Sequence, residues 1–235
     1  FFSTDFKLST IYRNQWQSVS TNGYNTCLFT AEARVLKSKR FRHSFGIGVG
    51  FLRDIAGALN FGQRQIFASL SYNKQIQKHN NHFLSIGLQL NNAYWSYDAT
   101  NADFGQSPSD WEGLYLSNLS YNDLSLGLHW QIEPQDMQTL SAGVAIFHIN
   151  TPSLSFLDEY ALNDLRLKPR YYTYVNYIFS TTEQTSLQLT ANLSQQHDNY
   201  EFIIGGLCNI DIAPTIFDQN NIGAGIYYRS NDAII

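Results

Sequence analysis

The strongest feature of the chain is a regular alternation of apolar and polar residues, repeated in many short runs. In the clearest run, residues 122–132, the apolar positions are Leu124, Leu126, Leu128, Trp130 and Ile132. A period of two places apolar side chains on one face of a β-strand and polar side chains on the other. The same alternation recurs at residues 84–91, 140–147 and 186–193.

Further segments are rich in β-branched and aromatic residues and are bounded by turn-forming residues, so they are also predicted to be strands. They are residues 6–12, 24–36, 43–52, 61–72, 171–180, 200–210 and 222–229. Together with the alternating runs they make about eleven strands. Helical periodicity is scarce, so the sequence predicts an all-β fold. Two long stretches, residues 94–120 and 150–168, are predicted to be irregular connections.

Strand length and the chemistry of the polar faces favour a transmembrane barrel over a soluble protein. Strands of soluble proteins cluster near roughly 5–6 residues, whereas a tilted strand needs about 9–11 residues to cross a bilayer. Most of the predicted strands approach the longer value. Their polar faces carry Gly, Ser, Gln, Asn and Thr rather than Lys and Glu, which suits the interior of a barrel. A soluble β-sandwich adhesin shows the same alternation and stays open as an alternative.

The composition is consistent with a membrane barrel. Charged residues make up 14% of the chain and aromatic residues 15%, whereas soluble domains carry about a quarter charged residues. Many Trp and Tyr residues stand beside predicted turns, as they do in the aromatic girdles of membrane barrels. The net charge of −4 and the scattered Lys and Arg offer no basic patch for nucleic acid. No apolar run approaches the roughly 18 residues of a membrane-spanning helix.

No group of residues predicts catalysis, a metal site or a cofactor. His79 and His82 are the closest pair of histidines, and they are predicted to be solvated residues of a turn. No GxSxG elbow accompanies a histidine and a carboxylate. Gly46, Gly48 and Gly50 alternate within a strand, where they let a large neighbouring side chain approach closely. The two cysteines are predicted to be packed thiols.

Several short motifs, taken in order, resemble those of the PorP/SprF family, outer-membrane proteins of the type IX secretion and gliding systems of Bacteroidetes. The first is Tyr12-Arg13-Asn14-Gln15-Trp16, after the first predicted strand. The others are residues 45–51 with Asp54 and Gly57, residues 83–89, residues 147–152, residues 167–172, and residues 225–229 with 232–235. Together these motifs extend over essentially the whole chain.

The resemblance implies an antiparallel transmembrane β-barrel of about fourteen strands, of which about eleven are visible here. It implies a single domain over residues 1–235, lacking the amino-terminal segment and the last strands of the family. It also implies a location in the outer membrane of a Gram-negative bacterium.

The implied function is non-enzymatic: the barrel assists the secretion or cell-surface attachment of adhesins. The expected partners are outer-membrane lipid, the secreted C-terminal domain of an adhesin, and a periplasmic lipoprotein or ring component of the secretion machine. No cofactor and no nucleic acid are expected. The alternative is a porin-like diffusion channel, because the inward faces of the strands are polar.

The residues predicted to bind a partner stand at strand ends within these motifs or in the long connections. They are Tyr12, Arg13, Asn14, Gln15, Trp16, Tyr97, Trp111, Arg170 and Arg229. Arginine forks bind carboxylates inside a barrel or on a partner protein. The alternative for the three arginines is an internal salt bridge with Asp54, Asp232 or Glu32.

Overall fold

The computed structural model describes ten ranges of the chain: residues 5–15, 23–38, 42–56, 61–77, 81–98, 116–135, 138–154, 166–182, 184–214 and 219–230. These ranges contain eleven strands. The strands are β1 (Phe6–Gln15), β2 (Tyr24–Ser38), β3 (His43–Ala56), β4 (Phe61–Gln77), β5 (His82–Asp98), β6 (Leu116–Gln135), β7 (Gln138–Phe147), β8 (Arg170–Ser180), β9 (Thr185–Gln196), β10 (Asn199–Pro214) and β11 (Gln219–Arg229). In the part of the chain that is described, no helix has the length and hydropathy needed to cross a bilayer.

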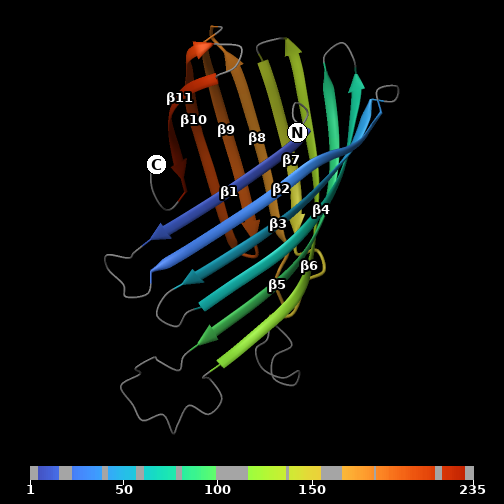
Figure 1. Ribbon diagram of the computed structural model, residues 1–235, viewed down its shortest axis with the longest axis vertical. Helices are drawn as coiled ribbons and strands as arrows, with labels where there is room; N and C mark the ends of the chain where they lie inside the picture. Colours follow the sequence, from blue (N-terminus) through green and yellow to red (C-terminus); the bar gives the residue numbers. More distant parts are fainter. Residues whose placement is uncertain are drawn as a thin grey trace.

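All eleven strands belong to one antiparallel sheet, and each strand pairs with its neighbours in sequence order. The sheet curls round, so that the first strands cross in front of β8 and β9 in Figure 1. Among the described residues β1 pairs with β2 alone and β11 with β10 alone, so the barrel is open along this seam. The predicted all-β antiparallel barrel is confirmed, and the sandwich alternative is wrong because the strands do not divide between two sheets.

Several strands are longer than the alternation predicted. The stretch 94–120 was expected to be irregular, yet β5 extends through Asp98 and β6 begins at Leu116, with Asp98 paired to Leu116 in the ladder. Aromatic packing stabilises this extension, because Trp95 makes an edge contact with Tyr121 at a ring distance of 5.8 Å. The alternation is weak in these segments, since both faces carry polar and aromatic residues.

The two ends of the barrel differ in the length of their connections. Odd-numbered strands end, and even-numbered strands begin, at the end that includes connections 99–115 and 148–169. We call this end the long-loop rim. The opposite end, the short-turn rim, has the connections 39–42, 78–81, 136–137, 181–184 and 215–218. Long loops on one rim and short turns on the other are typical of membrane barrels.

Apolar side chains face outward and polar side chains face inward, the reverse of a soluble domain. The apolar positions of β5, Leu84 to Leu90 in steps of two, are all exposed. Among the described residues, the buried hydrophobic ones are Ala93 and Tyr121, while the buried polar ones are Ser44, Asn73, Asn91, Asp123, Ser125 and Ser141. An apolar surface of this extent requires an apolar solvent such as lipid.

Aromatic residues on the outer face gather near both ends of the strands. The register places one set near the long-loop rim: Tyr12, Tyr94, Tyr171, Tyr200 and Tyr228. A second set lies near the short-turn rim: Phe45, Tyr72, Trp130, Tyr177 and Phe179. Most outer positions between them are apolar. Tyr and Trp prefer the membrane–water interface, so the two sets bracket an apolar band as aromatic girdles do.

On the inner face, aromatic rings lie close against glycines of the neighbouring strand. A Cβ added at Gly50 would collide with the ring of Phe67, and one added at Gly143 would collide with the ring of Tyr174. A Cβ at Gly205 would likewise meet the Tyr227 ring. These glycines therefore make room for rings that would otherwise project into the lumen. For the glycines of β3, the prediction that a large side chain approaches closely is confirmed at Gly50, whereas the nearest group at Gly48 is the Ser69 hydroxyl.

The orientation of the strands predicts unequal effects of a new charge on the two faces. Leu126→Arg places a cation on the outer face near the middle of β6, and we expect it to lower the free energy of unfolding by about 2–4 kcal/mol in lipid. Gln89→Arg, on the inner face of β5, should cost less than about 1 kcal/mol. Urea titration in lipid vesicles, followed by tryptophan fluorescence, measures both. Equal costs would contradict the assigned faces.

The contact between glycine and aromatic ring predicts that Gly143→Ala is destabilising. The new methyl group displaces the Tyr174 ring, and such overpacking costs about 1–3 kcal/mol. The control is Gly87→Ala, because a Cβ there meets nothing nearer than 3.9 Å, and removing a strand glycine should be neutral or slightly stabilising. Adding Tyr174→Ala to the first variant should recover part of the loss. Equal melting temperatures for the two alanine variants would show that the ring yields freely.

Candidate partner-binding rim

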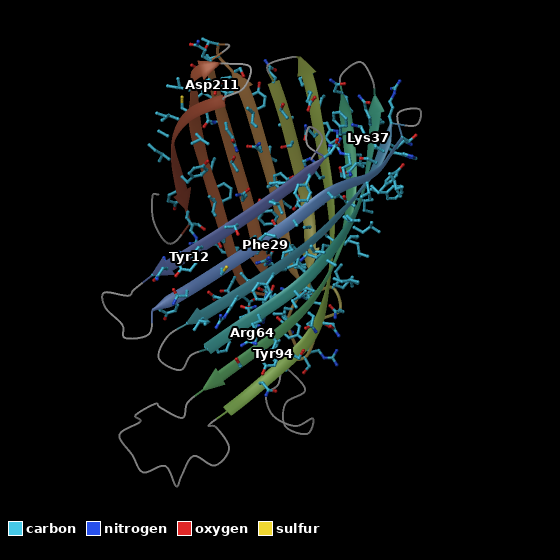
Figure 2. The ribbon with its side chains drawn as sticks, viewed as in Figure 1. Tyr12, Phe29, Lys37, Arg64, Tyr94 and Asp211 are labelled. Carbon is cyan, nitrogen blue, oxygen red and sulfur yellow. The ribbon has the colours of Figure 1, made fainter. Side chains whose placement is uncertain are left out.

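The seven predicted partner-binding residues whose backbone the structure describes all belong to the long-loop rim, as parts of strand ends. Tyr12 to Gln15 form the end of β1, Arg170 begins β8, and Arg229 ends β11. Trp16 and Trp111 lie outside the described residues, as does the side chain of Tyr97. Figure 2 shows Tyr12 at this end, together with Arg64 and Tyr94.

The end of β1 is an edge strand rather than a loop. The motif that starts at Tyr12 was predicted to follow the first strand, but the ladder continues from Tyr12 opposite Cys27 to Gln15 opposite Tyr24. Tyr12 points outward and is 69% exposed, with its hydroxyl 3.4 Å from Asn25 Oδ1. Since no described strand pairs with the other side of β1, its backbone can accept a further strand there.

The salt-bridge partners predicted for the arginines are wrong for Asp54 and Glu32. Asp54 accepts a hydrogen bond from the Thr26 hydroxyl at 2.5 Å, and Glu32 lies directly opposite Lys7 in the ladder. Asp232 is outside the described residues. The register of the strands places Thr26 next to Asp54 and Lys7 opposite Glu32, closer than any of the three arginines. The alternation of apolar and polar residues does not determine this register.

Arg229 and Arg170 lie on the inner face of the rim on either side of one carboxylate. The Nε atom of Arg229 is 2.8 Å from Glu201 Oε1, and both side chains are about two-fifths exposed. The Arg170 guanidinium stands over the Phe147 ring, 4.4 Å from its centroid. Arg170, Phe147 and Glu201 line a hollow of about 310 Å³.

The guanidinium of Arg170 has an N–H group with no hydrogen-bond acceptor among the described groups. Its Nε atom is buried and makes no hydrogen bond with any described group. A carboxylate entering the hollow would satisfy this donor, and guanidinium forks hold carboxylates with two parallel hydrogen bonds. The rim thus combines an open strand edge with a cation that is suited to an acidic group.

Sequence reasoning did not single out Glu201 or Phe147 as parts of this site. Phe147 stands in one of the recognised motifs, but its ring contact with Arg170 spans a long connection. Glu201 occupies a polar position in an alternating strand, like many others. Its role follows from the neighbour that the register brings to it, so only the paired strands reveal it.

The start of connection 148–169 is held against β6 by side-chain contacts, including two hydrogen bonds to backbone groups of β6. Asn150 donates from Nδ2 to the Asn122 carbonyl at 2.7 Å and accepts from the Leu124 amide at 3.0 Å. His148 Nδ1 lies 2.9 Å from Asp123 Oδ2, and the Asp123 side chain is only 3% exposed. The connection therefore leaves the barrel at a defined place, beside the hollow that Arg170 lines.

The other candidate chemistry is dispersed. Cys27 lies exposed on the outer face and Cys208 is half-buried, and neither forms a disulfide. The prediction of packed thiols is therefore wrong for Cys27. His82 packs against Trp130 at a ring distance of 6.0 Å, and His79 is outside the described residues. The described residues contain no group of three potential metal ligands.

The comparison with protein families decides the identity of this barrel. Residues 2–235 match the family described as type IX secretion system membrane protein PorP/SprF. The chain belongs to the PorP/SprF family. This confirms the resemblance inferred from the ordered motifs and makes the protein a membrane component of the type IX secretion system. Neither a curated protein nor a solved structure gives a significant match.

Two Asp–His pairs that differ in burial give a matched prediction for the rim of this PorP/SprF protein. Asp123→Ala leaves His148 unpaired in a site that is almost closed to water, and we expect a loss of about 2–3 kcal/mol in the free energy of unfolding. Asp198→Ala removes a 3.1 Å contact with His197 that is largely exposed, and should change stability by no more than about 0.5 kcal/mol. Equal losses would show that Asp123 does not anchor the connection.

Proposed function

We propose that this PorP/SprF protein is an outer-membrane barrel that assists the secretion or surface attachment of adhesins. It binds their secreted C-terminal domains at the long-loop rim and contacts periplasmic components of the secretion machine at the short-turn rim. It acts by holding proteins in place and performs no catalysis of its own.

The placement in the outer membrane rests on the surface of the barrel. Strands of 10 to 20 residues are long enough to cross a bilayer. They present an apolar outer band between two sets of aromatic residues, and a polar inner face. Barrels with this surface are characteristic of bacterial outer membranes, where long loops face outward from the cell and short turns face the periplasm. The long-loop rim is therefore the side that meets a secreted protein.

The observation that carries the binding role is the hollow at that rim, which Arg170 and Glu201 line, with Arg229 paired to Glu201. The unsatisfied Nε of Arg170 favours an acidic group on the incoming domain. The unpaired side of β1 offers backbone groups to an incoming strand, and strand addition supplies affinity through main-chain hydrogen bonds. Tyr12, Arg13, Asn14 and Gln15 lie on this edge, and we assign them to the same interface.

A binding experiment tests this role. The full chain in detergent is mixed with the C-terminal domain of a type IX adhesin from the same cells, and the bound fraction is measured by co-purification. Arg170→Gln should weaken binding at least about tenfold, because it removes a charge-assisted hydrogen bond worth about 1.5–3 kcal/mol.

The control is Arg64→Gln, which removes an equally positive charge from the outer face near the same rim. It should leave binding unchanged. If the unmodified protein fails to retain the domain, or if both variants lose it equally, the proposed binding site is wrong.

A diffusion channel is the second candidate, and the lumen supports it. A space of about 1040 Å³ lies inside the barrel, lined by residues that include Ser69, Asn73, His129 and Tyr174. Planar-bilayer conductance separates the two functions. A steady current that rises on Tyr174→Ala would favour transport of small solutes, whereas a silent protein that still binds the adhesin domain favours attachment alone.

A further inference from the structure

A second hollow lies at the opposite, short-turn rim, on the inner face of β2 to β5. Its volume is about 490 Å³. Three cations line it, Arg34, Lys37 and Arg42, together with the side-chain amides of Asn73, Gln75 and Asn81. No carboxylate is among its lining residues in the described part of the chain. The hollow is thus positive and rich in hydrogen-bonding groups.

Arg34 is held in this hollow with incomplete partners. Its side chain is only 6% exposed, and its Nη1 atom lies 3.7 Å from Asp5 Oδ1 on a side chain that is 78% exposed. Its Nη2 atom is buried without a hydrogen bond to any described group. Glu32, the neighbouring carboxylate on the inner face of β2, lies directly opposite Lys7. A buried guanidinium with an unsatisfied donor is costly, and an oxyanion in the hollow would stabilise it.

The short-turn rim is also divided by charge. Lys37, Arg42 and Lys74 lie at the ends of β2, β3 and β4. On the other side of the barrel, Glu133 lies near the end of β6 and Asp211 near the end of β10, and the described residues 133–135, 181–182, 184 and 211–214 include no Lys or Arg. Figure 2 shows Lys37 and Asp211 at the same end, on opposite sides of the barrel. Such a divided field favours one orientation of a charged partner.

We propose that the hollow around Arg34 binds a carboxylate-rich segment of a soluble protein that docks on the short-turn rim. The hollow opens on the inner face, because Arg34, Ser44 and Asn73 all lie on that face in the register, so membrane lipid on the outer face does not reach it. The amides around the cations suit a peptide backbone. The divided charge suits a macromolecule with both acidic and basic regions.

This inference deepens the proposed function and rests on it for one point: that the short-turn rim, and so the protein that docks there, is periplasmic. The binding of an acidic segment rests on the hollow itself. It can therefore be tested on the isolated protein, with no adhesin domain present.

The test uses a fluorescein-labelled peptide of six glutamates as probe and the full chain in detergent. Fluorescence anisotropy should show binding that weakens with salt, and a matched peptide of six glutamines should not bind. Lys37→Gln with Arg42→Gln, both exposed cations, should weaken binding about tenfold or more. Arg34→Gln should weaken it as well, with its thermal melting curve measured alongside.

The matched control is Arg53→Gln with Arg64→Gln, which removes two exposed cations from the other rim. Its net charge equals that of the variant with Lys37→Gln and Arg42→Gln. The control double variant should bind the glutamate peptide like the unmodified protein. Equal losses in the two double variants, or no binding by the unmodified protein, would overturn the site. Full displacement by an equal concentration of inorganic phosphate would show a small-anion site and overturn the assignment to a peptide. Each of these outcomes leaves adhesin binding at the long-loop rim unaffected, so failure of the two proposals can be told apart.

Discussion

The architecture of this protein depends on one requirement: in hydrocarbon, every backbone N–H and C=O group must find its partner within the protein. A continuous antiparallel ladder meets that requirement for ten neighbouring pairs of strands. Once the ladder exists, the alternation of side chains leaves only two environments, lipid and lumen. The outward row of leucine and isoleucine on β5 and the inward row of Ser85, Gly87, Gln89 and Asn91 are two results of the same backbone geometry. The described strands leave the backbone groups on one side of β1 and of β11 unpaired. These two edges can therefore pair with a further strand.

The alternation predicted the number of strands and their faces because both depend on local spacing alone. The apolar positions from Leu124 to Ile132 could be assigned to one face of a strand without knowledge of any other strand. Strand ends were harder, since residues 94–98 and 116–120 are paired through aromatic packing between segments far apart in the sequence. Those predicted binding residues that the structure describes lie at one rim because antiparallel neighbours return to the same end on every second crossing. The partner of Arg229 could not be predicted, because Glu201 becomes its neighbour only through the register of β10 and β11.

Charged residues are arranged differently at the two rims. At the long-loop rim, arginines flank a carboxylate, so cation and anion are already partly matched and the remaining donor is directed at an incoming group. At the short-turn rim, cations and carboxylates are separated across the width of the barrel, which produces a field extending beyond the protein surface. The first arrangement favours a close, specific contact; the second favours orientation of a partner before contact. The proposed function, in which each rim receives a different protein, requires both arrangements.

The outward position of the two thiols has a chemical consequence. Cys27 on β2 and Cys208 on β10 both point away from the lumen, and Cys27 is exposed on the outer face. A reagent confined to the lumen therefore does not reach either thiol. Two barrels that meet through their outer faces can bring their Cys27 thiols together, so a sample handled without reductant becomes prone to cross-linking between molecules.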